Sequence, residues 1–76
     1  MRFLVARYAQ HEDTPQSVTD VSSVGAEAFA RLLEVPAARL TDVYPLQREH
    51  ADGFRRLTGV TLDLERFAYF LEVEAD

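Results

Sequence analysis

The chain has 76 residues, and its eight arginines, absence of lysine and thirteen carboxylates give a formal net charge of −5. A chain of this length forms one domain, here residues 1–76, with a small core, and its charge excludes the basic surface that a phosphate backbone requires. We therefore expect no nucleic-acid partner. A basic protein surface is the better electrostatic match, although the same charge can serve solubility alone.

Cysteine is absent, so the fold has no disulfide and no thiolate that could act as a nucleophile or metal ligand. The apolar run within residues 1–10 is too short and too interrupted for a signal peptide, and no segment approaches the length of a membrane span. These features predict a soluble cytoplasmic protein without a membrane partner. Lysine, isoleucine and asparagine, whose codons are AT-rich, are all missing, which indicates a GC-rich bacterial genome.

The first elements predicted along the chain form a hairpin. Residues 2–10 mix branched and aromatic side chains in a short run that is typical of a strand. Both registers of this run carry apolar residues, which favours a central strand. Turn-forming residues at 13–15 separate it from a second predicted strand at 17–21.

A helix is predicted over residues 24–35, with Ser22 or Ser23 as its N-cap and Pro36 preventing its continuation. Its apolar residues recur at helical spacing, which is typical of an amphipathic helix that packs on a sheet. The predicted inward face consists of Ala26, Phe29, Leu32 and Leu33.

A third strand is predicted within residues 38–46, where Leu40, Asp42, Tyr44 and Leu46 alternate with Thr41 and Val43. Pro45 lacks a backbone donor, so we expect it at the end of this strand or facing away from a neighbour. A second helix is predicted over residues 47–58, with Gly59 just past its end. Inside this helix, Gly53 lowers stability by about 1 kcal/mol relative to alanine. Close packing of the backbone at this point would explain why a glycine is present, and so would mere tolerance of it. Its predicted inward residues are Ala51, Phe54 and Leu57.

The last predicted strand covers residues 67–74, after an extended lead-in that turns at Asp63. The element order is therefore strand, strand, helix, strand, helix, strand. We predict an α+β fold in which a mixed or antiparallel sheet of about four strands has both helices on one face. The side chains of the last strand that need cover from these helices are Phe67, Tyr69, Leu71 and Val73.

The other register of the last strand contains Phe70 among acidic residues, and Asp76 adds to the acidic end of the chain. Phe70 faces away from the predicted helices, so it is exposed or covered by another molecule. Aromatic side chains dominate binding hot spots and carboxylates at the rim steer a basic partner. Alternatively, Phe70 packs under a loop or inside the sheet of a dimer. The predicted protein-binding residues are Tyr8, Asp42, Tyr44, Phe70, Glu72 and Glu74.

No catalytic or metal-binding constellation emerges from the sequence. His11 stands beside two carboxylates in a turn, but adjacent turn positions do not generally converge on a metal ion. His50 has no evident partner that would orient it as a general base, and the three glycines are too widely spaced for a phosphate loop. We expect no enzymatic activity, metal or cofactor. The chemical alternative is a small ligand site formed by His50, Tyr44 and Asp63.

Three segments carry a family resemblance: "SVGAEAFARLLEV" at 23–35, "VYPL" at 43–46 followed by "REHADGFRRL", and "LDLERFAYFLE" at 62–72. Together they resemble a family of small bacterial single-domain proteins of unknown function. Phe67 stands where the family pattern leads us to expect a tyrosine, so a tyrosine hydroxyl contact is not carried over to this position. Genes for many such small acidic proteins neighbour toxins of interbacterial competition, and the resemblance implies an immunity-protein-like role.

Two functions therefore compete. The first is a small acidic protein-binding domain that neutralises a basic bacterial toxin by covering its surface. The second is a self-assembling structural or regulatory module that forms a homodimer through its sheet face.

Overall fold

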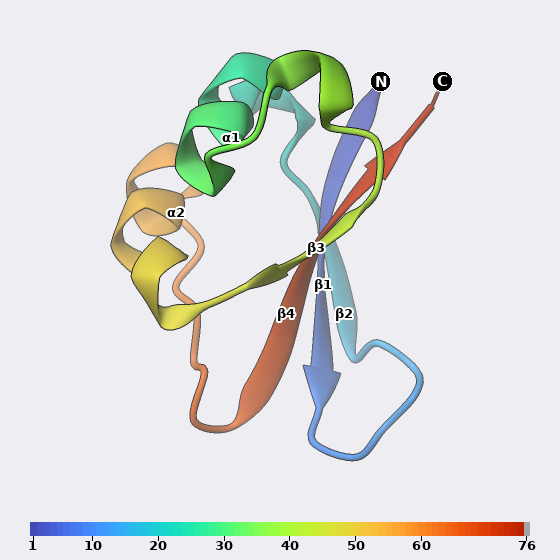
Figure 1. Ribbon diagram of the computed structural model, residues 1–76. Helices are drawn as coiled ribbons and strands as arrows, with labels where there is room; N and C mark the ends of the chain where they lie inside the picture. Colours follow the sequence, from blue (N-terminus) through green and yellow to red (C-terminus); the bar gives the residue numbers. More distant parts are fainter. Residues whose placement is uncertain (76) are drawn as a thin grey trace.

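The structure is a computed structural model that describes residues 1–75, so Asp76 lies outside the described residues. Four strands form one antiparallel sheet in the order β2-β1-β4-β3, and two helices pack on one side of it (Figure 1). This arrangement confirms the predicted α+β fold and its element order. The strands are β1 (Arg2–Ala9), β2 (Ser17–Asp20), β3 (Val43–Leu46) and β4 (Phe67–Glu74), and the helices are α1 (Ala26–Leu33) and α2 (Ala51–Thr58).

Helix α1 is shorter than predicted, and the predicted serine cap is wrong. The hydroxyl of Ser22 accepts a hydrogen bond from the amide of Phe3 at 2.8 Å and donates to the carbonyl of the same residue at 3.4 Å. The hydroxyl is therefore used to hold β1, and Ser22–Val24 forms a separate 3-10 turn. Helix α1 begins after Gly25, and it ends where Glu34 adopts a left-handed conformation with a φ of 57°. Two residues therefore separate the end of the helix from Pro36.

Helix α2 follows the prediction more closely, after a 3-10 turn at Arg48–His50 and with Gly59 in the left-handed conformation at its end. A Cβ atom added at Gly53 would lie only 2.6 Å from Cδ1 of Leu32 in α1. Close packing of the two helices therefore accounts for this glycine. One predicted inward residue is wrong, because the side chain of Leu57 is 38% exposed.

Gly53→Leu is expected to lower the free energy of unfolding by about 0.5–2 kcal/mol, because the new side chain must displace Leu32 of α1, a cost that the gain in helix propensity offsets only in part. Urea denaturation monitored by circular dichroism measures this loss. Arg55→Leu, at an exposed position of the same helix, is the matched control and is expected to change stability by less than about 0.5 kcal/mol. Equal losses in the two variants would contradict the close helix approach.

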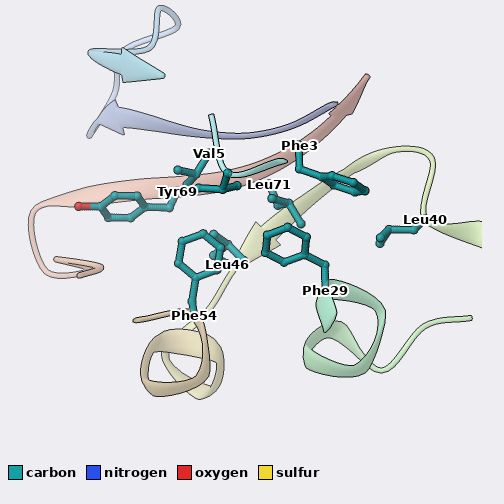
Figure 2. Packing of buried hydrophobic residues seen from close by; sticks show 9 residues of the cluster. Phe3, Val5, Phe29, Leu40, Leu46, Phe54, Tyr69 and Leu71 are labelled. Carbon is teal, nitrogen blue, oxygen red and sulfur yellow. The ribbon is translucent and has the colours of Figure 1, made fainter. Parts of the chain in front are cut away.

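The core lies between the helices and the sheet (Figure 2). The ring of Phe29 packs 5.2 Å from that of Phe3 in β1 and 6.1 Å from that of Phe54 in α2, measured between centroids. Phe29, Phe54, Leu40 and Leu71 are the largest fully buried side chains. No helix within residues 1–75 has the length and apolar character needed to cross a membrane.

The predicted third strand begins later than expected. Residues Ala37–Arg39 form a 3-10 turn, which is followed by the fully buried side chain of Leu40, and β3 starts only at Val43. Because β3 is an edge strand, only its β4 side is paired, which fits the expectation for Pro45.

Candidate protein-binding face

The sheet has one face covered by the helices and one that they leave uncovered (Figure 1). In β1, Phe3 and Val5 face the helical core. Successive side chains of a strand alternate, so the intervening residues point to the uncovered side. Strand pairing places Tyr8 opposite Ala68 and Ala6 opposite Phe70 on that side. We call this side the open face; by register it carries Arg2, Leu4, Ala6, Tyr8, Val18, Asp20, Val43, Pro45, Ala68, Phe70, Glu72 and Glu74.

Two aromatic rings meet on the open face. The rings of Tyr8 and Phe70 make an edge-to-face contact, with centroids 5.5 Å apart and planes at 87°. Both side chains are half-buried, and Ala6, directly opposite Phe70, is fully buried although no helix lies over it. The aromatic pair therefore belongs to a small packed cluster that still has exposed surface.

A hollow of about 480 Å³ opens beside this aromatic pair. The hairpin loop between β1 and β2 provides one of its walls through residues 10–13. The amide of Glu12 donates to the carbonyl of Ala9 at 3.2 Å, and the side chain of Gln10 donates to the carbonyl of Glu65 at 3.2 Å. These bonds hold the loop in place against β4 and its lead-in. The remaining lining residues of the hollow are Tyr8, Ala9, Val43, Ala68, Phe70 and Glu72.

Charge is distributed unequally along the chain. Residues 22–66, which supply both helices and β3, carry six arginines and seven carboxylates. Residues 1–21 and 67–75, which supply the other three strands and the hairpin loop, carry two arginines and five carboxylates. All five of these carboxylates lie on the open face or line the hollow: Glu12, Asp13, Asp20, Glu72 and Glu74. The open face is therefore the acidic side of the protein.

Two of these carboxylates are already engaged by an arginine. Arg2 lies 3.7 Å from Asp20 and 3.6 Å from Glu74, at the end of the sheet where β1 begins. In contrast, within residues 1–75 no ion pair involves Glu12, Asp13 or Glu72. The carboxylates that line the hollow are thus the ones that remain available to a partner.

The contacts of Asp20 predict a pH dependence of stability. Hydrogen bonding to Ser22, whose backbone amide donates to the carboxylate at 2.8 Å, lowers the pKa of Asp20, and the charge of Arg2 lowers it further. Because the folded carboxyl has the lower pKa, its stabilisation is present above the ordinary value of 3.8 and is lost as the pH falls through the folded value. Asp20→Asn should reduce this acid-side loss in thermal unfolding measured across acidic pH, and a profile parallel to the wild type would contradict the assignment.

The structure brings together part of the predicted binding site. Tyr8, Phe70 and Glu72 share the open face and line the hollow. Glu74 lies on the same face but pairs with Arg2. Asp42 precedes β3, where its carboxylate accepts a hydrogen bond from the amide of Val43 at 2.8 Å.

The expected position of Tyr44 on this face is wrong. Tyr44 lies opposite Leu71, on the helical side of the sheet, and its hydroxyl donates to the carbonyl of Arg39 at 2.8 Å. Tyr44 shares its register with Leu46, which is buried in the core, so alternation along β3 directs Tyr44 to the helical side and Val43 to the open face. Val43 is 51% exposed and lines the hollow.

The residues of the alternative ligand site each have a local structural partner. Nδ1 of His50 accepts a hydrogen bond from the amide of Gln47 at 2.9 Å, which caps the first turn before α2. The amide of Asp63 donates to the hydroxyl of Tyr69 at 3.2 Å, and its carbonyl accepts from the amide of Phe67 at 3.0 Å. Among residues 1–75, no three metal-ligating side chains gather into a site.

Sequence reasoning missed the contribution of residues 10–13, because it placed Gln10 at the end of the first predicted strand and the residues after it in a solvated turn. One signal was present: antiparallel pairing places the loop after β1 at the end of the sheet where β4 begins. The conformation of the loop was not predictable from pattern, since His11 adopts a left-handed φ of 66° that its residue type does not demand.

Comparison with known protein families gives a match over most of the chain. The model of a family described as a domain of unknown function (DUF7683) matches residues 2–72, from the start of β1 into β4. No curated protein and no solved structure matches the chain.

Proposed function

The chain belongs to this family of domains of unknown function, and we propose that it is a protein-binding domain that docks a basic partner protein on its open face. The observation that carries the proposal is the hollow, which combines two aromatic rings with three carboxylates on the side of the sheet that the helices leave uncovered. Aromatic anchors in pockets are typical of binding hot spots.

The dimensions of the protein agree with this use of the face. A typical stable interface takes about 800 Å² from each partner. That area is roughly a sixth of the 5103 Å² surface of this protein. The acidic balance of the face also speeds encounter with a basic surface and disfavours nucleic acid.

We further propose that the partner is a bacterial toxin, which this domain neutralises in the manner of an immunity protein. Toxins that cleave nucleic acids need basic surfaces, because their substrate is an anion. A small acidic domain that covers such a surface excludes the substrate. The support for this role is the net charge of −5, the acidic open face and the resemblance of the segments around β3 and β4.

The test is isothermal titration calorimetry of the purified protein with the products of toxin-like neighbouring genes. We expect at least one product to bind, with an affinity that falls as salt increases from about 50 to 500 mM, because exposed charges are screened. Amide shifts of the bound, ¹⁵N-labelled protein should map to β1, β4 and residues 10–13. The toxin proposal fails if no such product associates, and the docking proposal fails if the shifts map to α1 and α2.

Homodimerisation through the open face is the second candidate. Two valines on this face are strongly exposed, Val18 at 52% and Val43 at 51%, and a second copy would cover them. Light scattering decides between the two uses. A dimer that persists on dilution means that self-association consumes the face, whereas a monomer leaves the face free for a different protein.

A further inference from the structure

We infer that the hollow is the receptor for a single arginine side chain of the partner, inserted between the Tyr8–Phe70 pair and the carboxylates of Glu12, Asp13 and Glu72. This inference rests on the proposed function, since it specifies what the basic partner places in the hollow.

The shape of the hollow suits a long side chain with a charged end. Its apolar lining comes from Val43, Ala68 and the two aromatic rings, while the carboxylates stand on two different elements, the hairpin loop and β4. A volume of about 480 Å³ is more than one side chain requires, so the adjoining backbone of the partner can enter as well. The methylene stem of an arginine would pack on the apolar lining and carry its guanidinium to the carboxylates.

The chemistry of the lining favours arginine over other side chains. A guanidinium stacks on aromatic rings, is weakly hydrated and binds carboxylates through two parallel hydrogen bonds. The ammonium of lysine is more strongly hydrated and lacks this planar geometry. A neutral side chain would bury carboxylates without compensating their charge, which is costly. None of the lining residues is an arginine, so no arginine side chain of the hollow's own lining occupies the proposed site.

The opposite face of the same sheet contains a contact of this kind within the chain. The guanidinium carbon of Arg7 lies 4.5 Å from the centroid of the Phe67 ring. The hollow offers an aromatic pair together with three carboxylates that form no ion pair within residues 1–75, so it can receive a guanidinium from a partner.

The experiment titrates the ¹⁵N-labelled full chain with N-acetyl-arginine methylamide and follows the amide shifts by NMR. We expect saturable shifts confined to residues 8–13, 43 and 68–72, with a Kd of about 1–10 mM, as is usual for a ligand of this size. The corresponding lysine compound should bind at least about threefold more weakly. The citrulline compound, which keeps the shape and lacks the charge, should produce no saturable shift.

Two variants and a control localise the effect. Glu72→Gln removes a carboxylate from the hollow and Phe70→Leu removes an aromatic ring, and each should weaken arginine binding at least about threefold. Glu27→Gln, at an exposed position of α1, should leave binding unchanged. Thermal unfolding of each variant shows whether the fold is retained.

Three results would overturn the inference: citrulline or lysine binding as tightly as arginine, shifts centred on α1 and α2, or no arginine binding at all. The calorimetry with neighbouring gene products shows whether a failure of arginine binding also means that no protein docks on the open face. If a protein partner still binds the open face while arginine does not, the docking face stands and the arginine receptor falls. If neither binds, both are wrong.

Discussion

Phe29→Ala is expected to lower the free energy of unfolding by about 3–5 kcal/mol. A chain of 76 residues has a total of about 4–11 kcal/mol, so this one change removes a large part of the stability. The reason is the central position of Phe29 in the core, where a fully buried ring links Phe3 of the sheet to Phe54 of the neighbouring helix (Figure 2). Alanine leaves a cavity that three separate elements would have to move to fill.

Urea denaturation measures this effect, with Leu57→Ala as the matched control. Leu57 is also a large apolar helix residue, but it is 38% exposed, so its truncation should cost less than about 1.5 kcal/mol. Similar losses for the two variants would mean that Phe29 does not hold the core together.

Phe70→Glu is expected to weaken binding of the partner protein at least about 30-fold, the effect of losing one hot-spot residue. The substitution removes an aromatic wall of the hollow and adds a negative charge beside Glu72. Phe70 is half-buried on the face without helices, so the variant should still fold. Calorimetry with the wild-type partner gives the affinity, and circular dichroism confirms that the variant is folded.

Leu57→Glu is the control for this charge substitution, because it places a new carboxylate on α2, in the layer on the other side of the sheet. It should leave the affinity unchanged. Should Phe70→Glu bind as the wild type does, the open face is not the docking surface. In light scattering, the same pair of variants tests the homodimer, which only Phe70→Glu should dissociate.

The strands that the sequence predicted best are those whose alternation is strongest. In β4, every second residue from Phe67 to Val73 is apolar and faces the helices, and the residues between them face the other way. Both the bounds of this strand and the face on which Phe70 lies agree with the prediction. This success reflects the exact two-residue period of a strand, which needs no knowledge of its neighbours.

One error arises where a distant contact decides the local structure. Ser22 suits a helix cap by residue type, but its hydroxyl is used by the backbone of Phe3, nineteen residues away. A local pattern does not contain this competitor, so the loss of the cap could not be predicted from it. The error at Tyr44 is of another kind: Tyr44 shares its register with the buried Leu46, so the alternation itself indicated the helical side.

The candidate site was predictable only where it depends on strand alternation. The pairing of Tyr8 with Phe70 follows from alternation in two adjacent strands, whereas the wall of residues 10–13 depends on loop geometry. The hollow itself arises from the combination of the two.

The position of β4 in the sheet also has a consequence for how the protein is made. This strand follows the other three in sequence, yet it pairs with β1 and with β3. While the ribosome is still translating β4, β1 lacks one of its two neighbours in the described sheet, and β3 lacks the one strand with which it pairs there. The segment between β1 and β4 must close into a loop before these contacts form, so we expect folding of this sheet to be completed only after β4 has emerged from the ribosome.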